Sequence, residues 1–128
     1  MASLKLLLVD DAEDIRRMYQ DFLESKGVRV VTAADGQAAI EAVGYESPDA
    51  IVLDLAMPKM DGWEVIRHLR KEPWSSRIPI VVLSGLDEKE SALAAGANSY
   101  LAKPALPKDV LDEVRRLLSL RTEPSAAD

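Results

Sequence analysis

The sequence contains no cysteine, which excludes disulfide bonds, thiolate metal sites and cysteine nucleophiles together. It also lacks a long apolar run near its start. Leu6–Val9, the longest N-terminal apolar stretch, is too short for a membrane span or a secretory h-region and runs directly into two aspartates. We therefore expect a soluble, uncleaved protein, and the missing cysteines fit a reducing cytoplasm as its location.

Positive charge is scarce as well. The chain has 16 Lys and Arg against 22 Asp and Glu, a formal net charge of −6. Nucleic acids and anionic membranes attract clustered Lys and Arg, so neither is an expected partner. With 128 residues and 48% hydrophobic content, the chain is the size of one domain with one core. We expect that domain over residues 1–120 and a flexible C-terminal tail over residues 121–128.

Short apolar segments recur along the chain, mostly without polar alternation. Such segments are typical of strands buried on both faces of a sheet. The predicted strands are Leu4–Val9, Val28–Ala33, Ala50–Leu53, Ile78–Leu83 and Ser99–Ala102.

Segments with helical spacing, bounded by start and stop residues, alternate with these strands. The predicted helices are a first one that is followed by Gly27, Gly36–Val43 between Asp35 and Gly44, Gly62–Lys71 between Asp61 and Pro73, Glu88–Ala95 between Asp87 and Gly96, and an amphipathic helix over about Pro107–Leu120. Strict alternation of strand and helix predicts a doubly wound α/β fold, with a parallel sheet covered by helices on both faces.

Polar residues follow four of the five predicted strands, where ligands bind in open parallel sheets. Asp10 and Asp11 end the first strand, and Asp54 ends the third. Carboxylates gathered at one edge either raise a pKa or attract a cation, and oxygen ligands without His or Cys favour Mg²⁺. Ser84 and Lys103 end the last two strands and suit a phosphoryl oxygen. Together these groups indicate a phosphoryl-transfer site.

Each of these residues also has an ordinary explanation. Asp11 could cap the first helix, and Asp54 and Ser84 could be turn or loop residues. Lysines such as Lys103 mostly lie on the surface. Because all of these residues gather at one sheet edge, a shared phosphoryl-transfer site is favoured over separate, unrelated roles.

Four motifs resemble the receiver domains of bacterial two-component response regulators. They are LLLVDD (Leu6–Asp11), IVLDLAMPKMDGWE (Ile51–Glu64), VVLSG (Val81–Gly85) and GANSYLAKP (Gly96–Pro104). The resemblance extends from Leu4 to about Leu120. It implies a receiver domain with the flavodoxin-like strand order 2-1-3-4-5, in a stand-alone protein or excised from a longer one.

The resemblance also implies a metal-assisted phosphoacceptor. Asp54 would take a phosphoryl group from a phosphohistidine on a sensor histidine kinase or a phosphotransfer protein. Asp11 would bind Mg²⁺ (or Mn²⁺) directly and Asp10 through water, with the backbone carbonyl of Ala56 completing the protein ligands.

Further residues would make this site a switch. Lys103 would pair with the phosphoryl oxygens, the Ser84 hydroxyl would move toward them, and the ring of Tyr100 would then turn inward. Pro104 would follow a cis peptide bond. The changed surface would act on an unknown downstream protein, so we expect a regulatory domain rather than an enzyme.

The sequence departs from the family between Ser84 and Lys103, which lie about three residues closer than in the commonest receivers, close to one helical turn. The fourth helix or the loop before it is therefore expected to be short, and the usual docking surface does not carry over directly. Ala56 and Leu86 are non-polar where relatives tune dephosphorylation, so we expect no strong built-in phosphatase activity.

Two other functions fit the residues less well. A phosphatase that forms an aspartyl phosphate would resemble Asp-x-Asp, with the second carboxylate as general acid, but Ala56 stands at that position. An interaction module that works without phosphorylation would be expected to lack Asp54, Asp11 or Lys103, and all three are present.

Overall fold

The computed structural model describes residues 3–55, 61–85 and 87–121. Strands and helices alternate strictly along the chain, as predicted. In order they are β1 (Lys5–Val9), α1 (Glu13–Ser25), β2 (Arg29–Ala33), α2 (Gly36–Glu46), β3 (Ala50–Asp54), α3 (Gly62–Lys71), β4 (Ile80–Ser84), α4 (Lys89–Ala95), β5 (Ser99–Ala102) and α5 (Pro107–Arg121). The expected tail at residues 122–128 lies outside the described residues.

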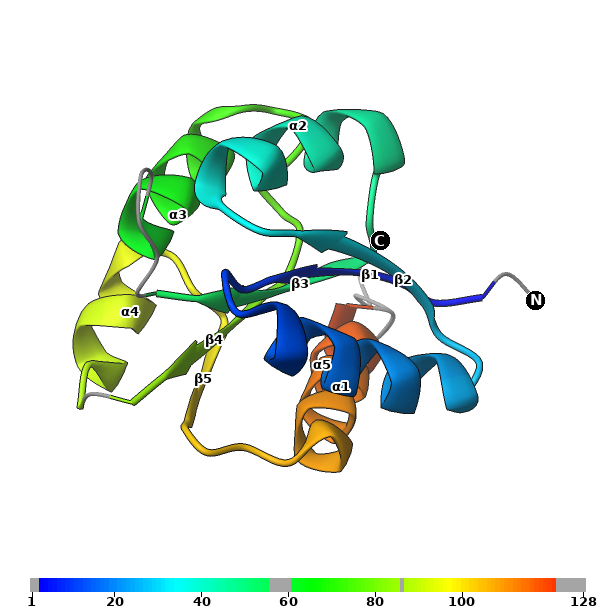
Figure 1. Ribbon diagram of the computed structural model, residues 1–128. Helices are drawn as coiled ribbons and strands as arrows, with labels where there is room; N and C mark the ends of the chain where they lie inside the picture. Colours follow the sequence, from blue (N-terminus) through cyan, green and yellow to red (C-terminus); the bar gives the residue numbers. More distant parts are fainter. Residues whose placement is uncertain (1–2, 56–60, 86, 122–128) are drawn as a thin grey trace.

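The strands form one parallel sheet in the order β2-β1-β3-β4-β5, which confirms the doubly wound fold and its flavodoxin-like order. Helices α2 and α3 lie on one side of the sheet and α1 and α5 on the other (Figure 1). Because β1 has β2 on one side and β3 on the other, the chain reverses its direction of winding at β1. Crevices at such points, beyond the carboxyl ends of the strands, are where open sheets bind ligands.

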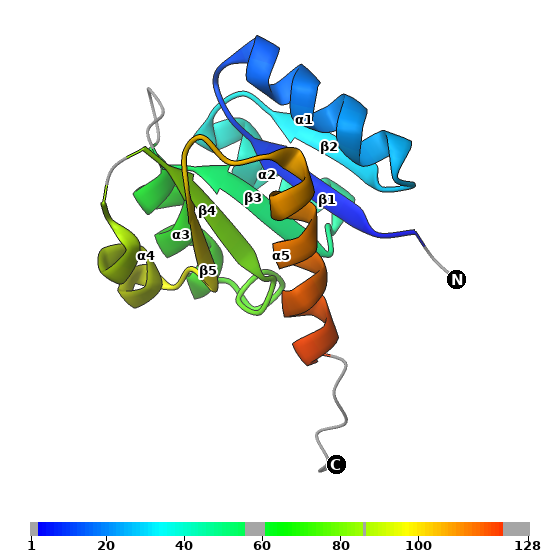
Figure 2. The ribbon, with the colours of Figure 1, turned by 90° about the horizontal axis from the view of Figure 1, so that it is seen from below.

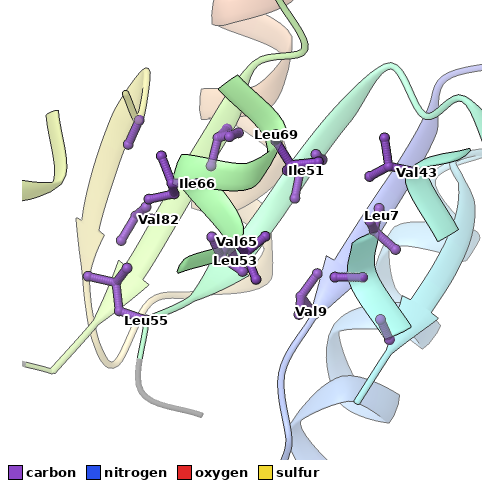
Figure 3. Packing of buried hydrophobic residues seen from close by; sticks show 14 of the residues in the cluster. Leu7, Val9, Val43, Ile51, Leu53, Leu55, Val65, Ile66, Leu69 and Val82 are labelled. Carbon is purple, nitrogen blue, oxygen red and sulfur yellow. The ribbon is translucent and has the colours of Figure 1, made fainter. Parts of the chain in front are cut away.

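Two apolar cores, one on each face, hold the layers together. Side chains alternate along a strand, so Leu7 and Val9 of β1 face α2 and α3, while Leu6 and Leu8 face α1 and α5. Figure 3 shows the first core closely, with Ile51 and Leu53 of β3 among the labelled side chains. Figure 2 shows the molecule from the side of α1 and α5. All three central strands, β1, β3 and β4, are almost wholly buried.

The sequence prediction of strands buried on both faces is wrong at both edges of the sheet. In β2, Arg29 and Thr32 are exposed and only Ala33 is buried, and in β5 only Ser99 is buried. An edge strand has a neighbour on one side only, so part of its surface meets solvent. Among the described residues, no helix combines the length and the apolar composition that crossing a bilayer requires.

Two predicted helix boundaries are also wrong. Helix α2 continues through Gly44 and ends at Glu46, and its C-cap is Ser47, which has a φ of 47°. Pro48 follows and disfavours a further helical turn. Helix α4 begins at Lys89 rather than Glu88, so its N-cap is Glu88 and not Asp87. With 7 residues, α4 is the shortest of the described helices, in line with the expected shortening.

Arg70 joins the ends of three elements. Its Nη1 donates to three carbonyl oxygens of the loop after α3, and its Nε donates to the carbonyl of Gly96. Its Nη2 donates to Asn98 Oδ1, which also accepts from the backbone of Ile80. Burial lowers the pKa of the Arg70 guanidinium. One side chain therefore fixes the starts of β4 and β5 relative to α3.

We expect Arg70→Leu to lower the free energy of unfolding by about 2–4 kcal/mol, because several half-buried acceptors lose their donor. Urea denaturation measures the change. Arg67→Leu, at an exposed position of the same helix, is the control and is expected to cost far less. Equal losses in the two variants would show that the Arg70 contacts add no stability.

Candidate functional site

The predicted site residues come together at the carboxyl edge of the sheet. Asp54 is the last residue of β3 and Ser84 the last of β4. The register pairs Asp54 with Leu83 and Ser84 with Ala102, so Lys103 follows directly beyond this edge. Asp10 follows β1 on the other side of β3. Parallel pairing thus places one polar strand end beside the next.

The three carboxylates form a tight cluster. Asp10, Asp11 and Asp54 each offer an oxygen within 4.8 Å of the others. Asp10 and Asp54 are buried, whereas Asp11 is exposed. Burial raises the pKa of Asp10, the amide of Ala12 opposes that rise, and the charge of Asp54 adds to it. A compact set of oxygen donors carrying like charges fits a hard divalent cation such as Mg²⁺.

Backbone contacts fix Asp10 in this cluster. Its amide donates to the carbonyl of Ala33 (3.1 Å), and its Oδ1 accepts from the amide of Ala12 (2.9 Å). Arg16 Nη1 donates to its carbonyl (2.8 Å). Ala12 is the N-cap of α1 and has no side-chain cap hydrogen bond. The alternative role of Asp11 as a helix cap is therefore wrong, and its exposed carboxylate remains beside the other two.

Lys103 supplies positive charge to the cluster. Its Nζ lies 3.0 Å from Asp54 Oδ2, and the Lys103 side chain keeps 34% of its surface exposed while that of Asp54 keeps 5%. The amide of Lys103 donates to the carbonyl of Ser84 (2.8 Å), which fixes where the side chain starts. The long lysine stem then carries the ammonium to the Asp54 carboxylate.

The peptide bond between Lys103 and Pro104 is cis, as expected. The loop that follows Pro104 is held by Tyr19, a residue that the sequence analysis missed. Buried Tyr19 of α1 donates its hydroxyl proton to the carbonyl of Ala105. Burial raises the pKa of this tyrosine, and the charge of Asp10 adds to the rise. No motif marks Tyr19, because its role depends on a partner 86 positions away.

Gly62 is a second residue that the sequence analysis did not single out. Its amide donates to the carbonyl of Leu55 (2.9 Å). A Cβ at this position would lie 2.5 Å from Leu55 Cα and 2.7 Å from the carbonyl oxygen of Asp54. Only glycine allows α3 to begin so close to the end of β3. The Asp-Gly pair was a detectable signal, since Asp61 caps α3 by accepting from Glu64 N at 3.0 Å.

The two predicted switch residues meet at a residue that the sequence analysis did not assign. Ser84 Oγ donates to Glu88 Oε1 (3.1 Å), and the Glu88 amide donates to the hydroxyl of Tyr100 (3.3 Å). Ser84 is buried, whereas Tyr100 and Glu88 are half buried. Ala56, whose carbonyl was expected to bind metal, and Leu86 lie outside the described residues.

Known proteins are similar to this chain in sequence and in fold. The family model described as response regulator receiver domain matches residues 6–115. The probable transcriptional regulator ycf27 of Cyanophora paradoxa is 43% identical over 122 residues, 93% of this chain and 49% of that protein. The alkaline phosphatase synthesis transcriptional regulatory protein PhoP of Bacillus subtilis is 41% identical over 117 residues, 89% of this chain and 48% of that protein. The chain thus spans about half the length of these two regulators.

A solved structure with the same fold bears on the carboxylate cluster. The receiver domain of the sensor histidine kinase PA1611 from Pseudomonas aeruginosa has a TM-score of 0.82 and 32% identity, covering 90% of this chain and 97% of that one. In that protein a magnesium ion is coordinated in the active site cleft.

We expect Asp10→Asn to raise the melting temperature in EDTA, because it removes one of three mutually repelling charges while keeping an oxygen for the Ala12 amide. Millimolar Mg²⁺ should raise the melting temperature of the parent and have much less effect on the variant.

The control is Asp21→Asn, at an exposed position of α1, which should respond to Mg²⁺ as the parent does. An equal rise in parent and Asp10→Asn would argue against a metal site at these carboxylates.

Proposed function

Because the chain belongs to the response regulator receiver domain family, we propose that it is a phosphorylation-dependent signalling switch whose phosphoacceptor is Asp54. The observation that carries this proposal is the setting of the Asp54 carboxylate. It is buried, lies 3.0 Å from Lys103 Nζ, and shares one sheet edge with the carboxylates of Asp10 and Asp11. The family is regulatory, so the phosphorylated domain itself is the product.

The proposed chemistry is transfer from a phosphohistidine of a sensor histidine kinase or a phosphotransfer protein. A carboxylate oxygen of Asp54 attacks phosphorus, a P–O bond forms, and the P–N bond breaks with its electron pair returning to the imidazole nitrogen. Lys103 exchanges its carboxylate partner for a phosphoryl oxygen, so its positive charge follows the new negative charge.

The three carboxylates repel an incoming phosphoryl group, so positive charge in addition to that of Lys103 would favour its approach. The donor set fits Mg²⁺, which Asp11 would bind directly and Asp10 through water. When bound, the cation supplies charge neutralisation for the phosphoryl oxygens. Asp10 and Asp11 would keep the cation close to Asp54, because both residues follow directly after β1. Ser84 and Tyr100 would respond to the phosphoryl group and alter the surface seen by a downstream protein.

Incubation with Mg²⁺ and acetyl phosphate, followed by intact mass measurement, tests the proposal. We expect one phosphoryl group on the parent and none on Asp54→Ala, because no other carboxylate of the cluster is the acceptor. Asp49→Ala, which changes an aspartate far from this edge that accepts from the amide of Lys5, should still be phosphorylated. Labelling of Asp54→Ala at the level of the parent would refute the assignment.

The surface beside Lys103 supports a protein as the natural phosphodonor. A groove of about 390 Å³ is bounded by Ile15, Met18 and Tyr19 of α1 and by the segment from Lys103 to Ala105. Ile15 and Met18 are 39% and 47% exposed, so a partner could cover part of both apolar side chains. A donor that docks here would seat apolar side chains next to the phosphoacceptor, so we propose that the kinase or phosphotransfer protein binds this groove.

We expect Met18→Lys to slow phosphotransfer from a purified, autophosphorylated histidine kinase that labels the parent by roughly tenfold, because a buried charge disrupts an apolar contact. Phosphorylation by acetyl phosphate should stay unchanged, since that donor needs no docking surface. Leu93→Lys, which alters an exposed apolar residue of α4, is the matched control. If the kinase phosphorylates both variants at the same rate, the groove is not its docking site.

A further inference from the structure

We propose that Glu88 is a positioning residue that holds the Ser84 hydroxyl in the resting state and competes with the phosphoryl group for its proton. This inference rests on the proposed function of Asp54. Neither the family comparison nor the sequence motifs point to Glu88. Its assignment comes from two hydrogen bonds that link it to both switch residues, Ser84 and Tyr100.

The geometry makes the competition direct. Ser84 lies at the end of β4 and is 4% exposed, and its Oγ donates to Glu88 Oε1 at 3.1 Å. A serine hydroxyl carries one proton and therefore donates one hydrogen bond at a time. A phosphoryl group on Asp54 that takes this proton must displace the Glu88 carboxylate. Because the resting acceptor is a charged carboxylate, its hydrogen bond with Ser84 opposes the switch.

The start of the fourth helix places Glu88 within reach of Ser84. Helix α4 has 7 residues and starts at Lys89, five positions after Ser84. Glu88 occupies its N-cap position but makes no side-chain cap hydrogen bond. Its carboxylate is thus used for Ser84 rather than for the helix, although a capping side chain is the usual occupant of that position. Substitution at Glu88 consequently removes no helix cap.

The backbone of Glu88 connects the same contact to Tyr100. Its amide donates to the tyrosine hydroxyl at 3.3 Å, and the ring of Tyr100 packs against the core beside α3 and α4. Release of the Glu88 side chain by Ser84 frees the start of α4 to move relative to this hydroxyl. Glu88 therefore transmits the change at Ser84 to Tyr100.

The test measures binding of beryllofluoride, a phosphoryl mimic, in the presence of Mg²⁺ by ¹⁵N NMR of the full chain. Glu88→Ala should bind it roughly tenfold more tightly than the parent, because a charge-assisted hydrogen bond no longer opposes the switch. Glu88→Gln keeps an acceptor without the charge and should fall between the two. Glu90→Ala, which removes an exposed acid of the same helix, should bind as the parent does.

The decisive comparison uses the Ser84→Ala background, where there is no hydroxyl proton to compete for. There Glu88→Ala should leave the affinity unchanged, which a double-mutant cycle shows as a coupling between the two residues. Two results overturn the inference while leaving the proposed function intact: a parent that binds the mimic as tightly as Glu88→Ala, or a gain that persists fully without Ser84. A parent that binds no mimic at all overturns both.

Discussion

Mutual repulsion among Asp10, Asp11 and Asp54 is the force that the site is organised around. Their oxygens approach within 4.8 Å of one another, and Lys103, whose Nζ lies 3.0 Å from Asp54 Oδ2, offsets part of the charge. Buried apolar strands hold the carboxylates in place against that repulsion. The stability of the cores thus keeps three like charges close together, which favours a cation at this edge.

The arrangement separates the chemistry from its transmission. Asp10, Asp54 and Lys103 are fixed by strand ends, where backbone ladders leave little freedom. Ser84 is also on a strand, but its hydroxyl engages Glu88 at the start of a short helix, and Glu88 engages Tyr100. Under the proposed function, a charge change at Asp54 would reach Tyr100 through Ser84 and Glu88.

The sequence predicted the fold and the ionic part of the site because both follow from regular periodicity. Parallel strands carry polar residues to one edge whatever the details of the loops, so Asp54 and Lys103 could be placed together from their positions at strand ends. Gly62, Tyr19 and Glu88 were not predicted. Their roles depend on a close backbone approach, on a partner far along the chain, and on where a short helix begins.

A crystal structure of the chain with Mg²⁺ and beryllofluoride would examine this account most directly. The predicted result is beryllium on the Asp54 carboxylate, with Lys103 Nζ and Ser84 Oγ both within hydrogen-bonding distance of its fluorides, the cation beside Asp11, and the bond from Ser84 to Glu88 broken. Beryllium absent from Asp54, with Lys103 still paired to a bare carboxylate under conditions that saturate binding, would contradict it.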